Sequence, residues 1–145
     1  MNADCPLCNG DGGAVLWRDD QLRIVAPGET NHPGMLRVIW NRHVREMTDL
    51  DAEDRAACLH AVFSCERVLR AVLQPDKINV ASLGNVVPHL HWHVVPRYRD
   101  DPHFPDPIWG SPRRDTVRGV PVDFAVRVSE RLRAWSRNAG RRESS

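Results

Sequence analysis

Apolar residues recur along the chain with two different periods, and each period predicts its own kind of element. Residues 14–17 and 22–25 are short apolar runs on either side of an Asp-Asp turn, which is typical of a β-hairpin. Residues 35–40 predict a third, mostly buried strand. Residues 78–81 and 88–96 predict two more, and the second has its prolines at the ends, where a strand tolerates them.

Two further segments have the apolar spacing of a helix. Over residues 51–73 the apolar positions share one face, with Thr48 or Asp51 as the N-cap and Pro75 marking the end. Residues 121–137 predict a second amphipathic helix. The sequence therefore predicts an α+β fold, in which an antiparallel sheet of about five strands packs against a long central helix and a C-terminal helix.

Length and charge narrow the class of protein. The 145 residues fit one domain, which we assign to residues 1–138, with 139–145 as a disordered tail. The net charge of +1 argues against a nucleic-acid partner. The sequence contains neither an apolar run long enough for a membrane span nor a signal peptide, so we expect a cytoplasmic protein. Because cytoplasmic thiols stay reduced, we interpret its four cysteines as metal ligands or core residues in preference to disulfides.

The segment His89-Leu90-His91-Trp92-His93 carries the strongest chemical signal. Alternate residues of a strand point to one face, so the three imidazoles lie together. Burying them requires a partner for each ring nitrogen, which favours a site over a plain core. Two kinds of chemistry fit: metal binding, or attack on phosphorus by a neutral imidazole whose other N–H is held by an acceptor such as a backbone carbonyl. A neighbouring imidazole can then donate a proton to the leaving group.

Residues 89–95 (HLHWHVV) resemble the signature of the histidine triad (HIT) family, in which histidines alternate with apolar residues. Pro-Arg at 96–97 and the segment 37–43 (RVIWNRH) support the likeness, which covers roughly residues 5–110. The resemblance implies a HIT-like sheet with flanking helices, a homodimer, and hydrolysis or transfer of nucleoside monophosphates through a nucleotidylated histidine.

The resemblance also implies roles for individual residues. His91 is the nucleophile, and His93 contacts the phosphate of a purine nucleotide. Asn79, Gly84 and Asn85 belong to the region that cradles this phosphate. Many members carry Gly-Gln-Ser/Thr-Val in the loop where this chain has Gly-Asn-Val-Val, so a hydroxyl donor is missing and the amide is one carbon shorter.

Other aromatic and imidazole side chains lie outside the signature. Trp109 follows the proline-rich loop 99–113 and is a candidate for stacking on the base, although packing or a dimer contact explains it equally well. His32 and His103 are expected in loops and His60 on a helix surface, each without a special role.

Cys5 and Cys8 form a Cys-x-x-Cys unit, a pattern that redox and metal sites share. No thioredoxin-like βαβ pattern surrounds it. Some HIT relatives, and the related galactose-1-phosphate uridylyltransferases, bind zinc with such a pair, a histidine like His43 and the first triad histidine. The resemblance therefore implies a structural zinc site made by Cys5, Cys8, His43 and His89. His89 would then orient the strand and not act as an acid or base.

Three functions remain open at this point. The leading one is a nucleotide hydrolase that releases AMP from dinucleoside polyphosphates or nucleoside phosphoramidates. The second is a nucleotidyl transferase or phosphorylase, which inorganic phosphate would reveal by changing the product from AMP to ADP. The uridylyltransferases carry glutamine at the third triad position, so His93 argues against that branch. The third is a zinc-held nucleotide-binding module without catalysis.

Overall fold

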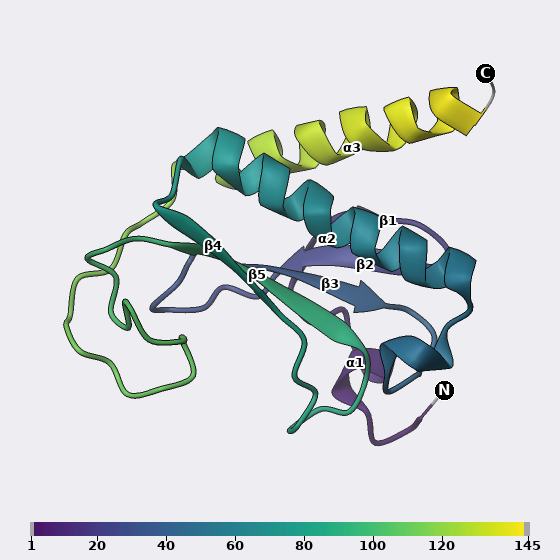
Figure 1. Cartoon of the computed structure of the whole chain (residues 1–145), viewed down its shortest axis with the longest axis horizontal. Helices are drawn as coiled ribbons and strands as arrows, with labels where there is room; N and C mark the ends of the chain where they lie inside the picture. Colours follow the sequence, from purple (N-terminus) through teal and green to yellow (C-terminus); the bar gives the residue numbers. More distant parts are fainter. Residues whose placement is uncertain (1, 144–145) are drawn as a thin grey trace.

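A single antiparallel sheet organises the chain, and its strands run in the order β1-β2-β3-β5-β4 (Figure 1). The computed structural model describes residues 2–143, with side chains as far as Ser136. The strands are β1 (Ala14–Arg18), β2 (Leu22–Ala26), β3 (Leu36–Trp40), β4 (Lys77–Ala81) and β5 (His91–Arg97). The helices are α1 (Pro6–Asn9), the short 3-10 helix η1 (Met47–Asp49), α2 (Ala52–Leu73) and α3 (Phe124–Glu143). The predicted α+β class and five-stranded sheet are confirmed.

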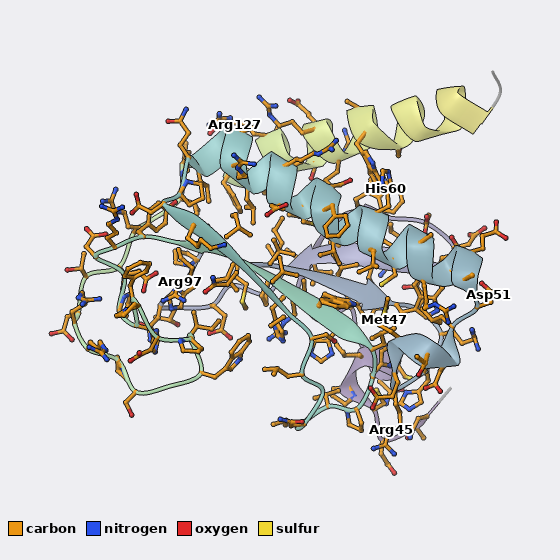
Figure 2. The ribbon with its side chains drawn as sticks, viewed as in Figure 1. Arg45, Met47, Asp51, His60, Arg97 and Arg127 are labelled. Atoms are coloured by element: carbon orange, nitrogen blue, oxygen red, sulfur yellow. The ribbon has the colours of Figure 1, made fainter. Side chains whose placement is uncertain are left out.

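The long helix α2 begins and ends where the sequence predicts. The carboxylate of Asp51, labelled at the start of α2 in Figure 2, accepts a hydrogen bond from the Asp54 backbone N–H at 2.8 Å. At the other end Gln74 takes a left-handed conformation with φ of 52°, which ends the helix directly before Pro75. The cap and the proline therefore set both ends of α2.

The main core lies between the sheet and the two long helices. In Figure 1, α2 covers one face of the sheet and α3 lies against α2, on the far side from α1. Cys58 and Cys65 of α2 are buried in this core, as the sequence predicted, and burial raises the pKa of Cys58 to about 11. These thiols are thus core residues and stay protonated at neutral pH.

The opposite face of the sheet, which we call the open face, is half covered by the N-terminal segment. Leu7 of α1 packs there against Val25 and Ile39. The buried Arg23 guanidinium donates hydrogen bonds to the carbonyls of Leu7, Gly10 and Asp11 at 2.7–3.0 Å. The N-terminal segment is therefore fastened over β2 and β3, and the half of the face formed by β5 carries the histidines.

Two element boundaries differ from the prediction. β5 begins at His91 and not at residue 88, because the Leu90 backbone N–H donates to the Val44 carbonyl instead of continuing a ladder. α3 spans Phe124–Glu143, whereas the sequence predicted residues 121–137 with a tail from 139; residues 144 and 145 lie outside the described part. Among the helices of residues 2–143, none has the length and apolar character needed to cross a membrane.

Candidate active site and metal cluster

His91 and His93 lie side by side on the open face, with ring centroids 5.0 Å apart. The sheet register sets their neighbours on β3, since Ile39 pairs with His91 and Arg37 pairs with His93. Leu90 and Trp92 contact the core on the helix side. The alternation therefore gives the arrangement that strand geometry requires.

The hydrogen bonding of His91 fixes its tautomer. Its Nδ1 lies 2.6 Å from the backbone carbonyl oxygen of His89. A carbonyl can only accept, so Nδ1 carries the proton and Nε2 keeps a free lone pair. His91 is also the most exposed of the three histidines, at 9% against 0% for His89 and 5% for His93. The nitrogen suited to attack thus belongs to the histidine that a substrate reaches most easily.

Burial and a nearby cation keep both imidazoles neutral. Burial lowers the pKa of His91, the hydrogen bond to His89 partly opposes this, and the charge of Arg37 lowers the pKa further. Burial, followed by His91 and Arg37, lowers the pKa of His93 to about 4. Both rings are therefore uncharged at neutral pH, which leaves the His91 lone pair available as a nucleophile.

Trp109 lies beside His93, and Asn79 lies on the same face of the sheet, opposite Val95. The Trp109 ring lies 5.1 Å from the His93 ring in an edge-to-face arrangement and remains half exposed. Asn79 of β4 accepts a hydrogen bond on Oδ1 from the Arg97 guanidinium at 2.6 Å. Because Arg97 can only donate, this bond orients the Asn79 amide so that its Nδ2 donors point away from Arg97.

Arg97 connects the triad strand to the loop that follows it (Figure 2). Its guanidinium forms a buried, two-pronged ion pair with Asp101 at 2.8 and 3.1 Å and donates to the Asp106 carbonyl at 2.8 Å. Asp101 in turn accepts backbone N–H groups from Tyr98, His103 and Phe104. This network shapes the loop that brings Trp109 to His93.

The loop before the triad is anchored by a residue that sequence reasoning missed. The Ser82 hydroxyl donates to the His91 carbonyl at 2.7 Å. Gly84 has φ of 73°, a conformation that favours glycine. Asn85 is exposed, and within the described residues its side chain makes no hydrogen bond to the triad. His93 and Trp109 are thus brought together, and Asn79 lies on the same face opposite Val95, whereas neither Gly84 nor Asn85 forms a hydrogen bond with the triad in the described part of the chain.

Four side chains from distant parts of the sequence converge into a cluster that can hold a metal ion: Cys5, Cys8, His43 and His89. Their ligand atoms all lie within 4.8 Å of one another. His89 Nδ1 lies 3.3 Å from the Cys5 Sγ, 3.6 Å from the Cys8 Sγ and 3.2 Å from the His43 Nδ1. The cluster therefore joins the N-terminal segment to the start of the triad strand.

The geometry of this cluster fits a tetrahedral ion. Metal–ligand bonds of about 2.0–2.3 Å place ligand atoms about 3.3–3.8 Å apart on the edges of a tetrahedron, and the distances above lie close to that range. His89 Nε2 donates to the Trp40 carbonyl at 2.6 Å, so Nδ1 is unprotonated and directed into the cluster. A backbone carbonyl that holds the second ring nitrogen is the usual support of a metal-binding histidine.

The expectation that His32 and His103 have no special role is wrong. Both were expected as ordinary loop residues, but they are 5% and 4% exposed, and their facing nitrogens, Nε2 of His32 and Nδ1 of His103, lie 2.8 Å apart. The His103 backbone N–H donates to Asp101. The pair is therefore a buried extension of the Arg97–Asp101 network, produced by the folding back of loop 99–113.

Comparison with known proteins decides the family. The model of the HIT domain matches residues 12–100. The chain belongs to the HIT family. It is 31% identical over 133 residues to a protein named AP-4-A phosphorylase from Mycobacterium tuberculosis, covering 84% of this chain and 68% of that one.

Solved structures share this HIT fold. A histidine triad protein from Bradyrhizobium japonicum is 25% identical, with a TM-score of 0.69 over 86% of this chain and 90% of its own. A Zn-bound histidine triad family protein from Mycobacterium smegmatis is 21% identical, with a TM-score of 0.65 over 93% and 97% of the two chains. The fold predicted from the triad signature is thus found in solved members of the family.

Proposed function

We propose that this HIT protein is a nucleotide hydrolase that releases AMP through a covalent nucleotidyl-His91 intermediate. Its substrates would be dinucleoside polyphosphates or nucleoside phosphoramidates. One observation carries the proposal: the His91 Nδ1–H is held by the His89 carbonyl at 2.6 Å, which leaves Nε2 as a neutral nucleophile on the open face. The family and the M. tuberculosis relative support nucleotide processing in general.

The reaction would proceed in two steps. His91 Nε2 forms a bond to the α-phosphorus while the bond from phosphorus to the leaving oxygen or nitrogen breaks. The leaving atom takes a proton, which the neutral His93 can relay from water by releasing one ring N–H as its other nitrogen accepts a proton; its ring lies 5.0 Å from that of His91. Water then attacks phosphorus and loses a proton to the solvent, the bond to Nε2 breaks, and AMP leaves with His91 restored to its neutral form.

Substrate binding would use side chains on both sides of the two histidines. The Asn79 Nδ2 donors, freed by the Arg97 contact, would bind phosphate oxygens together with His93 and the loop at Gly84 and Asn85. The half-exposed Trp109 ring beside His93 would stack on the purine.

A phosphorylase is the second candidate, and the name of the M. tuberculosis relative favours it. The two activities share the nucleotidyl-His91 intermediate and differ in the acceptor that attacks it. With water the product is AMP, and with inorganic phosphate it is ADP.

Incubating the pure protein with diadenosine tetraphosphate, with and without millimolar phosphate, distinguishes these candidates. We expect AMP as the product under both conditions, because water is the proposed acceptor. Chromatographic separation of AMP, ADP and ATP provides the measurement. ADP produced only when phosphate is present would replace the hydrolase with a phosphorylase, and tight AMP binding without turnover on any adenylated substrate would favour a binding module.

We also propose that Cys5, Cys8, His43 and His89 hold a structural zinc ion. Two thiolates and two imidazoles form a closed set of ligands, typical of sites where the metal stabilises the fold. Bound zinc would supply a crosslink between the N-terminal segment and the start of the triad strand. The Zn-bound relative from M. smegmatis supports this assignment.

Metal analysis tests the zinc proposal without reference to activity. Protein purified without chelators should contain about one zinc ion per chain. Cys8→Ser should lose most of this zinc and melt at a lower temperature, because the N-terminal segment loses its crosslink. Cys58→Ala is the matched control, since it removes a core thiol of α2 and should keep the zinc. Metal-free wild type, or equal zinc in both variants, would contradict the assignment.

The homodimer and the cytoplasmic location stay predictions. The family resemblance implies the dimer, and the outer edge of β4 is unpaired within the described sheet. Strand edges of this kind offer hydrogen-bonding groups to a second chain.

A further inference from the structure

The strands of the open face carry four arginines, Arg18, Arg23, Arg37 and Arg97, and among the described residues only Arg37 has no protein partner. Arg18 lies opposite Arg23 in the sheet register and pairs with Asp11. Arg23 donates to three carbonyls and to Asn41, and Arg97 is saturated by Asp101, Asn79 and the Asp106 carbonyl. Arg37 lies between them on β3. In the described part of the chain its side chain makes no hydrogen bond, and no carboxylate lies within 4.0 Å of it.

The described surroundings of Arg37 offer its side chain no acceptor. Its Nε is fully buried, and across the sheet it has Val25 on one side and His93 on the other. Arg37 as a whole is half-buried, so its charge lies at the surface of the open face while its buried Nε–H lacks an acceptor. Arg37 therefore has a free charge and a free donor with which an anion on the open face can pair.

His93 also has a buried nitrogen without a hydrogen-bond partner in the described chain. This nitrogen is Nδ1, and His93 is the residue paired with Arg37 in the sheet register. Two unsatisfied nitrogens thus lie on neighbouring strands and on the same face, two residues along β5 from His91. A phosphate oxygen accepts hydrogen bonds from both, with the His93 proton on Nδ1.

We propose that Arg37 is a substrate-binding residue that pairs with the phosphate of the nucleotide attacked by His91. This inference rests on the proposed function for the identity of the ligand. The position and the free charge of Arg37 identify the residue that binds its phosphate. Arg37 supplies a positive charge beside the phosphate that His91 attacks. As negative charge grows on the phosphoryl oxygens during attack, the guanidinium stabilises it.

Binding measurements separate this role from a structural one. In a His91→Ala background, which prevents turnover, calorimetry with AMP and with adenosine measures the contribution of the phosphate. Arg37→Met should weaken AMP binding about 10- to 100-fold and leave adenosine binding within about threefold. Arg37→Lys should restore part of the AMP affinity, because it keeps the charge without the two-pronged geometry.

Two further variants keep the experiment decisive. Arg67→Leu removes the same charge from the exposed surface of α2, on the other side of the sheet, and should change neither affinity. Arg37→Gln replaces the methionine variant if that one fails to fold. Unchanged AMP binding in a folded Arg37 variant, or an equal loss for AMP and adenosine, would overturn the assignment.

The same experiment distinguishes failure of this inference from failure of the proposed function. If the wild type binds AMP through Arg37 but cleaves no substrate, the hydrolase proposal fails and the Arg37 site stands. If AMP is released by the wild type and Arg37→Met retains both AMP affinity and kcat/KM, the hydrolase stands and the Arg37 site fails. If both proposals hold, kcat/KM for AMP release by Arg37→Met falls about 100-fold.

Discussion

Replacing His91 by alanine should reduce AMP release by at least about 10⁴-fold, because it removes the nucleophile on which both steps depend. Neither neighbour can replace it. His89 directs Nδ1 into the metal cluster and uses Nε2 to hold the Trp40 carbonyl. His93 is less exposed than His91 and lies two residues further along β5. Only direct attack by water would remain, assisted by the residues that bind the phosphate.

Rates of AMP release from the wild type and the variant provide the measurement. His60→Ala is the matched control, since His60 lies on α2 next to Trp135, on the helix side of the sheet (Figure 2). It should retain the wild-type rate. Acid-free mass spectrometry of wild type quenched during turnover should detect an adenylyl group, which His91→Ala should lack. A variant that releases AMP at the normal rate would eliminate the covalent mechanism.

Replacing Asp101 by alanine should cost about 3–5 kcal/mol of unfolding free energy, because it leaves the buried Arg97 charge without its partner. It also removes the acceptor of three backbone N–H groups. Urea unfolding followed by tryptophan fluorescence measures the loss. Asp106→Ala is the control, since it breaks a half-exposed ion pair with Arg113 and should cost no more than about 1 kcal/mol.

The pH dependence of this difference provides a second test. Burial alone would raise the pKa of Asp101, but Arg97 and the backbone N–H groups outweigh it and hold the pKa well below its usual range. A depressed carboxyl pKa stabilises the fold above the unfolded value of about 4, and this contribution is lost as the pH falls further. The gap between wild type and Asp101→Ala should therefore narrow in acid. A loss within about 1 kcal/mol at pH 7 would contradict the role assigned to the pair.

A double replacement separates charge from packing. Arg97→Met combined with Asp101→Leu leaves no buried charge and should recover part of the stability lost in Asp101→Ala. It should not recover activity, because Arg97 also orients Asn79 and holds the loop that carries Trp109.

Periodicity predicted most of the elements because local spacing encodes them. The alternation of histidines placed His91 and His93 on one face, and the cap at Asp51 with Pro75 set the ends of α2. The metal cluster came from family resemblance, since no local pattern joins Cys5 to a residue as distant as His89.

The contacts that sequence reasoning missed depend on how loops and strands meet. Loop 99–113 lacks a period, so the Arg97–Asp101 pair and the burial of His32 against His103 had no signal along the chain. Arg37 looked like one polar residue in a mostly buried strand. Its importance came from the register that pairs it with His93, which the sequence of β3 alone does not encode.

The N-terminal segment is synthesised well before the triad strand that completes its contacts. Cys5 and Cys8 leave the ribosome before their partner His89, which follows Cys5 by 84 positions. At about 5–20 residues per second, the two thiols wait roughly 4–17 s before β5 exists. During translation they are thus exposed to oxidants and to stray metal ions. The segment that covers β2 and β3 is synthesised early but can complete its contacts only after the triad strand has joined the sheet.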